Sequence, residues 1–438
     1  MSYELIQTLI KDYHSSPFRH ITKRDLDVPA VRDMSVAIVG ARRCGKTYRT
    51  HQMVGELMTT GLPIESICRV QFNDHRIAGL AAADLSMIDF SYYSLFPERR
   101  RGETDVWFVF DEIQRIDGWE DYVLSLLETQ THHVVITGST SKLLRGDIAT
   151  GLRGKNFALE LLPFSFREFI RHFGVAEDVV SSDGRARLRN MMDRYLFQGG
   201  FPGLLDLEPV FHIDMLQSYW DTMVLRDIAE GHPHDEINIA TLMLLGRSLA
   251  ARIGCPVTIR KLAENLRETG LKAAPETLHR YVDYFAEAFM LFSIPIFSSS
   301  DAVKNRNYRK IYSVDWSLAD AVAKGGGLGI SRKLENAVFV ELRRRGNEVA
   351  YYKTRKGYEI DFVTTSRTNR SKGVELLQVC YSMDTPETLE RELRGVPESA
   401  HFFGVNHACI ITMDEEKDIV VDNCNVRILP AWKWFLES

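Results

Sequence analysis

Residues 36–47 of this chain read Val36-Ala37-Ile38-Val39-Gly40-Ala41-Arg42-Arg43-Cys44-Gly45-Lys46-Thr47, and this stretch decides the fold. Its first four residues form an apolar run typical of a buried strand, and residues 48–53 are typical of a helix. A GxxxxGK[ST] sequence between a strand and a helix is the pattern of a phosphate-binding loop, or P-loop. The stretch therefore predicts an α/β fold that binds a nucleotide.

Each residue type in this loop has a physical reason. Gly40 and Gly45 allow tight backbone turns with positive φ, and the amides between them converge at the positive end of a helix dipole. Lys46 would neutralise charge on the β- and γ-phosphates, and the Thr47 hydroxyl would ligate Mg²⁺. The predicted binding residues for ATP and Mg²⁺ are Gly40, Ala41, Arg42, Arg43, Cys44, Gly45, Lys46 and Thr47. The alternative is a glycine-rich strand–helix turn without a ligand.

The composition of the whole chain limits the function further. A chain of 438 residues is too long for one ordinary domain, and 45% hydrophobic with 26% charged residues is typical of a globular protein. The net charge of −5 is close to neutral, so contact with nucleic acid or acidic lipid would need local patches. The 6 cysteines lack CxxC spacing, which argues against a disulfide framework and a zinc site.

Nothing in the sequence indicates a membrane partner. The N-terminus lacks the order of a signal peptide, and Glu287 interrupts the longest apolar run, which stays below the ~18 residues of a spanning helix. We therefore expect a soluble cytoplasmic protein.

Apolar strands alternate with helical segments after the loop. Strands are predicted at 64–72, 106–110 and 133–137, with a helix at 121–130. This alternation is typical of a parallel sheet covered on both faces, in which ligands bind beyond the carboxyl ends of the strands.

The strand at 106–110 ends in Asp111 and Glu112, which is the Walker B pattern. Asp111 would hold the Mg²⁺ ion, directly or through water, and Glu112 would orient and polarise the attacking water. With Lys46, Glu112 is a predicted catalytic residue. The alternative is a fold that binds a nucleotide without hydrolysing it.

Two further elements of an ATPase site follow. Thr137 and Ser139, at the end of the strand 133–137, are both candidates for sensing the γ-phosphate, although a simple turn explains them equally well. Arg145 and Arg153 are candidate catalytic arginine fingers, which would stabilise transition-state charge on a neighbouring subunit's nucleotide. A solvated surface arginine is the alternative for either.

These motifs together resemble a family of prokaryotic AAA-superfamily ATPases. The resemblance is carried by the ordered set GARRCGKT, FVFDEIQRIDGWED, VVITGSTSKLLRGDIATGLRGK, LPFSFREF and YLFQGGFPGLL. It implies a five-stranded ATPase core, an α-helical lid and a homo-oligomer. It also implies a C-terminal domain of unknown function, built as a winged helix plus a nuclease-like fold of the PD-(D/E)xK type. We accordingly predict an ATPase core at 1–164, a helical lid at 165–232, a winged helix at 233–318 and a nuclease-like domain at 328–438.

The middle of the chain has the layout of a helix-turn-helix with a wing. Helices are predicted at 237–253, 258–266 (with Thr258 as N-cap) and from Pro275, and the wing at 291–297 and 310–314. The candidate DNA-binding residues are Thr277, His279 and Arg280 on the third helix, with Lys304, Arg306, Arg309 and Lys310 in the wing loop. The alternative is a winged helix that packs against protein.

The nuclease-like domain lacks part of its pattern. In such a fold a helix acid, a strand acid and an acid-x-Lys pair surround Mg²⁺. Glu335 and Asp361 match the first two positions, but Gln378 and Cys380 replace the acid and the lysine. The lysines of nearby segments that could substitute are Lys353, Lys356 and Lys372. We therefore predict that nuclease activity is absent and that Glu335, Asp361 and Gln378 form a degenerate site.

Two classes of function are consistent with these motifs. The first is a Mg-ATP-hydrolysing AAA-type ATPase coupled to the binding or remodelling of duplex or branched DNA, in repair, recombination or defence. The second is a nucleotide-dependent switch that binds protein partners, as in signalling or toxin–antitoxin systems, without acting on DNA.

Overall fold

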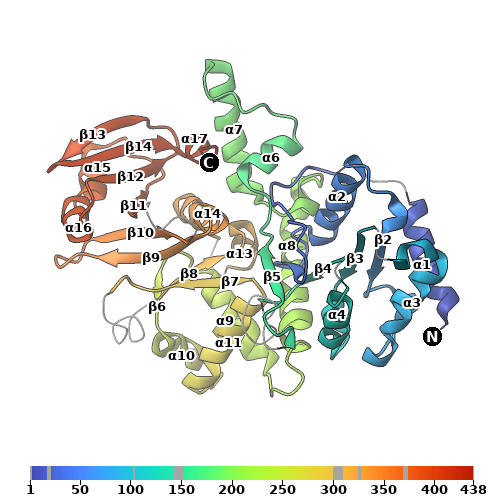
Figure 1. The fold of residues 1–438 in the computed structure, drawn as a ribbon. Helices are drawn as coiled ribbons and strands as arrows, with labels where there is room; N and C mark the ends of the chain where they lie inside the picture. The colour runs from blue at the N-terminus through green and yellow to red at the C-terminus, as the bar shows by residue number, and fades with distance from the viewer. Residues whose placement is uncertain are drawn as a thin grey trace. The chain divides into compact units, whose positions relative to one another are not determined.

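The structure is a computed structural model that describes residues 2–16, 21–101, 104–129, 131–141, 151–298, 309–323, 327–367 and 373–437. It divides into two compact units, Met1–Leu161 and Leu162–Ser438 (Figure 1). The division into four domains stays a prediction.

The first unit is built on a five-stranded sheet with the order β2-β3-β4-β1-β5, in which all neighbours are parallel. Its strands are β1 (Ser35–Val39), β2 (Ile67–Gln71), β3 (Val106–Asp111), β4 (His132–Gly138) and β5 (Asn156–Glu160). Every residue of β1, β3 and β4 is buried, as expected where helices cover both faces. The predicted parallel α/β sheet is confirmed.

Helices connect these strands. They are α1 (Tyr3–Ser15), α2 (Lys46–Thr59), α3 (Ser86–Leu95) and α4 (Trp119–Leu127), with short 3₁₀ turns at Ile64–Ser66, His75–Ile77, Ala82–Asp84, Pro97–Arg101 and Ile113–Arg115. The first turn of α2 directly follows the P-loop, so the amino end of this helix faces the carboxyl end of β1.

A connector at residues 21–34 binds to α2 before the chain enters the sheet. The Arg24 amide donates to Gln52 Oε1 at 2.7 Å, and Gln52 Nε2 donates back to the Arg24 carbonyl at 3.0 Å. Arg24 Nη1 donates to the Cys44 carbonyl of the P-loop at 2.7 Å, and Arg49 Nε donates to the Leu26 carbonyl at 2.7 Å. These contacts hold the loop from its outer side.

The second unit begins with helices. They are α6 (Phe166–His172), α7 (Ser182–Gln198), α8 (His212–Thr222), a π-helical turn (Met223–Ala229), α9 (Ile239–Ala250), α10 (Ile259–Glu268) and α11 (Pro275–Glu287). Short 3₁₀ turns lie at Pro202–Leu204 and Pro209–Phe211. The predicted start of α10 is confirmed, since Thr258 accepts from the Lys261 amide as its N-cap.

The glycines between α7 and the next turn contact a distant carboxylate. Asp315 is fully buried at the start of α13 (Trp316–Val322), where Oδ1 accepts from the Ser317 amide at 2.8 Å and Oδ2 from the Gly200 amide at 2.6 Å. A Cβ at Gly199, where φ is +78°, would lie 2.4 Å from Asp315 Oδ1. Glycine is required here because backbone and carboxylate approach this closely.

Two sheets complete the second unit. The smaller has the antiparallel order β6-β8-β7, with β6 (Pro256–Val257), β7 (Leu291–Ile294) and β8 (Arg309–Ser313). The larger has the order β13-β14-β12-β11-β10-β9, with β9 (Asn347–Lys353), β10 (Glu359–Ser366), β11 (Val374–Val379), β12 (His407–Thr412), β13 (Lys417–Val421) and β14 (Cys424–Pro430). Its helices are α14 (Ile330–Arg344), α15 (Pro386–Leu393), α16 (Val396–Phe403) and α17 (Ala431–Trp434).

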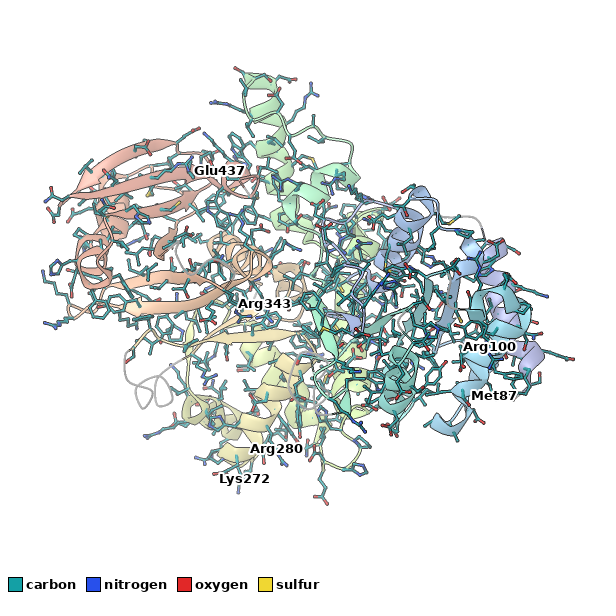
Figure 2. The ribbon with its side chains drawn as sticks, viewed as in Figure 1. Met87, Arg100, Lys272, Arg280, Arg343 and Glu437 are labelled. Carbon is teal, nitrogen blue, oxygen red and sulfur yellow. The ribbon has the colours of Figure 1, made fainter. Side chains whose placement is uncertain are left out.

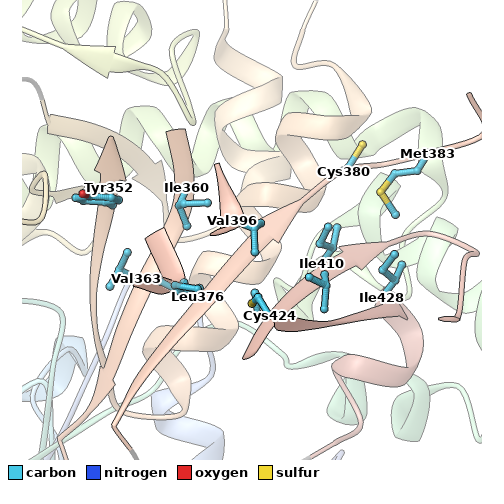
Figure 3. Packing of buried hydrophobic residues seen from close by; sticks show 13 residues of the cluster. Tyr352, Ile360, Val363, Leu376, Cys380, Met383, Val396, Ile410, Cys424 and Ile428 are labelled. Carbon is cyan, nitrogen blue, oxygen red and sulfur yellow. The ribbon is translucent and has the colours of Figure 1, made fainter. Parts of the chain in front are cut away.

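One face of the six-stranded sheet carries a hydrophobic core with α15 and α16. Ile360, Leu376, Ile410 and Ile428 come from four different strands and pack in one buried cluster with Val396 of α16 (Figure 3). This core fixes the register of β10 and thereby the position of Asp361, the residue after Ile360.

Candidate nucleotide-binding site

The P-loop between β1 and α2 has the backbone geometry that its glycines suggest. A Cβ at Gly40 would lie 2.1 Å from the Leu161 carbonyl oxygen, so only glycine fits against the chain after β5. Gly45 adopts φ of 102° at the N-cap of α2. Arg43, at φ of 67°, is the non-glycine residue of the loop with a left-handed backbone. Such turns direct successive amides toward one point.

Lys46 lies buried within the loop. Its Nζ donates to the carbonyl oxygens of Gly40 at 2.9 Å and Ala41 at 3.1 Å, and lies 4.0 Å from Glu112 Oε1. Only 4% of the side chain is exposed, so its position is set by the loop rather than by solvent. Cys44 is also buried, which raises the pKa of its thiol and keeps it neutral.

The carboxylate of Asp111 joins three elements at the carboxyl edge of the sheet. Thr47 Oγ1 of α2 donates to Asp111 Oδ2 at 2.9 Å, and Thr137 Oγ1 of β4 donates to Oδ1 at 2.5 Å. Asp111 has no exposed surface. The structure therefore brings together the three residues that sequence reasoning placed at separate strand ends.

Glu112 follows Asp111 with a left-handed backbone, at φ of 61°. Its amide donates to Thr137 Oγ1 at 3.0 Å, and its carboxylate accepts from Gln114 Nε2 at 2.5 Å. A non-glycine residue in this conformation carries strain that its surroundings must offset. These two contacts hold the Glu112 carboxylate beside Lys46.

Sequence reasoning missed Arg69 of β2. Its Nη2 lies 3.1 Å from Asp111 Oδ2, both side chains are buried, and the guanidinium lies over the ring of Tyr13 at 5.0 Å. An arginine inside the apolar strand Ile67–Gln71 is the signal that could have found it, because a buried cation requires a nearby acid. β2 lies directly beside β3 in the sheet.

The remaining predicted residues of this site have different outcomes. Ser139 is buried just after β4, whereas Thr137 contacts Asp111. Arg153 is exposed on the turn before β5 and has φ of 51°. Arg145 lies outside the described residues. The roles of all four stay predictions.

The candidate DNA-binding residues of the second unit lie on or near α11 and β8. His279 and Arg280 are exposed on α11, Thr277 is half-buried, and Arg309 is exposed at the start of β8. Lys304 and Arg306 lie outside the described residues. Arg280 and Lys272 both lie at the lower edge of the view in Figure 2.

One expectation for the wing loop is wrong. Lys310 does not reach solvent as a phosphate-binding residue would, because 1% of its side chain is exposed and β8 directs it into the second unit. Its Nζ lies 3.1 Å from Glu335 Oε1 and 3.0 Å from Asp361 Oδ1.

The degenerate nuclease-like residues also come together. Gln378 Oε1 accepts from the Asp361 amide at 3.1 Å, while its Nε2 donates to Glu392 at 2.8 Å. Cys380 is buried, which raises the pKa of its thiol to about 11, so the thiol stays neutral. Of the lysines proposed as substitutes, Lys353 contacts Glu359 at 3.3 Å, and Lys372 lies outside the described residues.

No helix within the described ranges is long and apolar enough to cross a membrane. Among the same residues, no group of three or more His, Cys, Asp or Glu side chains is arranged to hold a metal ion.

Comparison with protein families gives two matches along the chain. Residues 32–170 match the model of the AAA domain. Residues 189–332 match a domain of unknown function, DUF8612.

Comparison with solved structures gives distant likenesses. The Walker-type ATPase of Pyrococcus abyssi has a TM-score of 0.43 and 12% identity over 73% of this chain and 94% of that chain. The ORC1 protein of Aeropyrum pernix, solved in complex with DNA, has a TM-score of 0.28 and 13% identity over 66% of this chain and 86% of that chain.

Sequence relatives are closer. An uncharacterized protein of Haemophilus influenzae is 28% identical over 81% of this chain and 84% of its own length. The uncharacterized protein MJ1544 of Methanocaldococcus jannaschii is 31% identical over 95% of this chain and 91% of its own length. The chain therefore belongs to one family with MJ1544, and its residues 32–170 match a P-loop domain of the AAA type.

Proposed function

We propose that this chain hydrolyses ATP with Mg²⁺ at the P-loop of its first unit. The observation that carries the proposal is the pair of hydrogen bonds that Thr47 and Thr137 make to the two oxygens of Asp111. Through them the loop, β3 and β4 meet at one point, with Lys46 and Glu112 beside it.

The residues at this point fit Mg²⁺. A threonine hydroxyl and a carboxylate are hard oxygen ligands, and Mg²⁺ binds through one or two such groups together with substrate phosphates. Thr47 and Asp111 would hold the ion, whose charge would offset that of the phosphates. The fully buried Asp111 carboxylate and its contact with Thr47 support this assignment.

The chain's own residues supply the remaining steps. Lys46, which donates to loop carbonyls, would turn to the β- and γ-phosphates. Glu112 would accept a proton from the attacking water, since its carboxylate is 17% exposed and Gln114 and Thr137 orient it. Thr137, which bonds to the Asp111 carboxylate and the Glu112 amide, would keep these two acids in position.

The test compares ATP turnover in the full chain with that of two variants. Glu112→Gln is expected to keep ATP binding and to slow turnover by about 10²–10⁴-fold, because the amide cannot accept the proton. Lys46→Ala is expected to lose ATP binding. Glu98→Gln, at a carboxylate with 62% exposure, is the matched control and should turn over normally. Unchanged turnover in Glu112→Gln would remove Glu112 from its role.

We also propose that the second unit couples this cycle to DNA, with α10, α11 and the turn between them as the contact surface. On α10 and α11, Arg260 is paired with Glu264 and Arg280 lies 3.7 Å from Asp235. Within the described part of the chain, Lys261, Arg267 and Lys272 are exposed and form no ion pair. Exposed lysine and arginine side chains without an acidic partner are the groups that bind the phosphates of DNA.

Salt-dependent DNA binding tests this coupling. Duplex and junction DNA should bind at low salt and lose affinity steeply as salt rises, and the triple variant Lys261→Ala, Lys272→Ala, Arg280→Ala should reduce that salt dependence. ATP turnover should rise with DNA in the natural chain. Absence of binding at low salt, with and without ATP, would favour the nucleotide-dependent switch that binds protein partners.

We propose further that copies of the chain assemble, with Arg153 reaching a neighbour's nucleotide. The exposure of Arg153 beside the core sheet supports this. Arg153→Ala is expected to slow turnover. Adding the Lys46→Ala variant, which keeps Arg153, should restore part of that turnover if the two variants form mixed oligomers. Light scattering with and without ATP measures the assembly directly.

A further inference from the structure

The second unit contains a lysine buried among three carboxylates. Lys310 Nζ lies 2.8 Å from Glu359 Oε1, 3.0 Å from Asp361 Oδ1 and 3.1 Å from Glu335 Oε1. The lysine comes from β8 of the small sheet. Glu335 comes from α14, and Glu359 and Asp361 come from β10 of the large sheet. An ammonium has three N–H groups, and each finds one carboxylate here.

This cluster is enclosed on several sides. The exposed fractions are 1% for Lys310, 13% for Asp361, 15% for Glu335 and 29% for Glu359. Gly254 closes one side, because a Cβ there would lie 2.7 Å from Glu335 Oε2. Water therefore has little access to the ammonium.

The lysine is held in its charged form. Burial alone would lower the pKa of Lys310, but the carboxylates of Asp361, Glu335 and Glu359 outweigh it and hold that pKa above the usual value. The cluster therefore contains a resident positive charge supplied by the chain itself.

The carboxylates are oriented toward that charge by further contacts. Tyr312 Oη donates to Glu335 Oε1 at 2.7 Å, and the Val379 amide donates to Asp361 Oδ2 at 3.1 Å. The Asp361 carboxylate is therefore held at Oδ2, which leaves Oδ1 for the cation. Carboxylate oxygens are the ligand type that a hard divalent cation prefers, and here the Lys310 ammonium occupies the place between them.

We propose that Glu335, Glu359 and Asp361 form a cation site whose resident cation is the Lys310 ammonium, and that Mg²⁺ or Mn²⁺ binds there only when this ammonium is removed. Both kinds of cation need the same carboxylate oxygens, so they compete for one position. In the natural chain the Lys310 ammonium then keeps a divalent metal ion out of this cluster. The Lys310 side chain instead ties the small sheet to the large one.

Terbium luminescence measures the site in the full chain. Tb³⁺ binds to carboxylate clusters and is excited through a nearby phenol; Tyr312 touches Glu335, and the Tyr351 ring centre lies 5.7 Å from Lys310 Nζ. In the natural chain, Asp361→Asn is expected to leave Tb³⁺ luminescence unchanged. In Lys310→Met, a new saturable signal is expected, which Asp361→Asn abolishes and Mn²⁺ displaces.

Two variants keep the test decisive. Lys353→Met is the matched control, since Lys353 contacts Glu359 at 3.3 Å on its outer side, and it should create no new signal. The double variant Lys310→Met, Glu359→Gln removes one carboxylate charge together with the lysine. It takes the place of Lys310→Met if that single variant fails to fold. The rise in melting temperature that Mn²⁺ causes in Lys310→Met, or in the double variant, is the second readout.

Two results would overturn the proposal. One is luminescence of the natural chain that falls when Asp361 is replaced, which would show a metal site that coexists with Lys310. The other is a folded Lys310→Met chain, or folded double variant, with no added Tb³⁺ signal and no stabilisation by Mn²⁺.

Discussion

At the scale of single residues, the buried pair of Arg69 and Asp111 is the feature that most constrains the candidate site. Arg69→Met is expected to lower the free energy of unfolding by about 3–5 kcal/mol, because it leaves the fully buried Asp111 carboxylate without its cation. Thermal unfolding measures the loss.

A second variant separates charge from packing at this pair. Arg69→Met combined with Asp111→Asn should be more stable than Arg69→Met alone, since no buried charge remains. A double variant no more stable than the single one would attribute the loss to the contact of Arg69 with Tyr13.

Residues within one continuous motif could be predicted from the sequence, and those from distant segments could not. The P-loop, Asp111 and Glu112 are consecutive or follow a recognisable strand, so their pattern is visible along the chain. Arg69 and Lys310 form ion pairs with Asp111 and Asp361 of other strands, and these partners come together only in the folded chain. Their visible signal is a cation within an apolar strand, which also occurs at solvated strand edges.

At the scale of elements, His132 links β4 to two helices of the first unit. Its Nδ1 lies 2.8 Å from the Leu126 carbonyl of α4, and its Nε2 lies 2.6 Å from Tyr93 Oη of α3. Burial lowers the pKa of this histidine. The ring is therefore neutral in the folded protein, with Nδ1 as donor and Nε2 as acceptor.

A pH dependence follows from this shift. The pKa of His132 is lower in the folded chain than the value of about 6.5 in the unfolded chain, so protonation favours unfolding. The stabilising contribution is present above that value and is lost as the pH falls below it. Replacing His132 with Gln should flatten the fall in melting temperature between pH 7 and pH 5.

The control for this prediction is another histidine of the same unit. His75 has 94% of its side chain exposed, so His75→Gln should leave the pH profile as it is in the natural chain. Equal profiles for the natural chain and His132→Gln would contradict the assignment.

The sequence predicted the elements better where their patterns were local. Buried strands such as β3 and β4 are continuous apolar runs, and Thr258 marks the start of α10 as an N-cap. The boundary of α4 was less exact, because it begins at Trp119 rather than near residue 121, after Gly118 with φ of 79°. That turn depends on a left-handed glycine, which a periodicity of apolar residues does not reveal.

At the scale of the whole molecule, Asp315 connects segments that the predicted domains assign separately. It binds the Gly200 amide of the predicted lid from the end of the predicted winged helix, and Trp316 Nε1 donates to the Leu196 carbonyl at 3.0 Å. Such contacts between distant segments cannot be read from the local patterns that suggested the domain boundaries.

Replacing Asp315 tests this connection. Asp315→Ala leaves the Gly200 and Ser317 amides without their acceptor, and each buried unsatisfied group costs about 1–3 kcal/mol. We expect a lower melting temperature and faster protease cleavage at residues 199–203. The control is Asp214→Ala, an exposed acid of α8, and cleavage that is no faster in Asp315→Ala than in this control would contradict the role.

The connector at residues 21–34 has a practical consequence for anyone who shortens the chain. The AAA-domain match begins at residue 32, and a fragment cut there would keep all five strands of the sheet. It would lose the support that Arg24 and Leu26 give to Cys44 and Arg49. The start of the family match is therefore not the start of the cooperative folding unit, and a fragment for biophysical work should retain the residues before it.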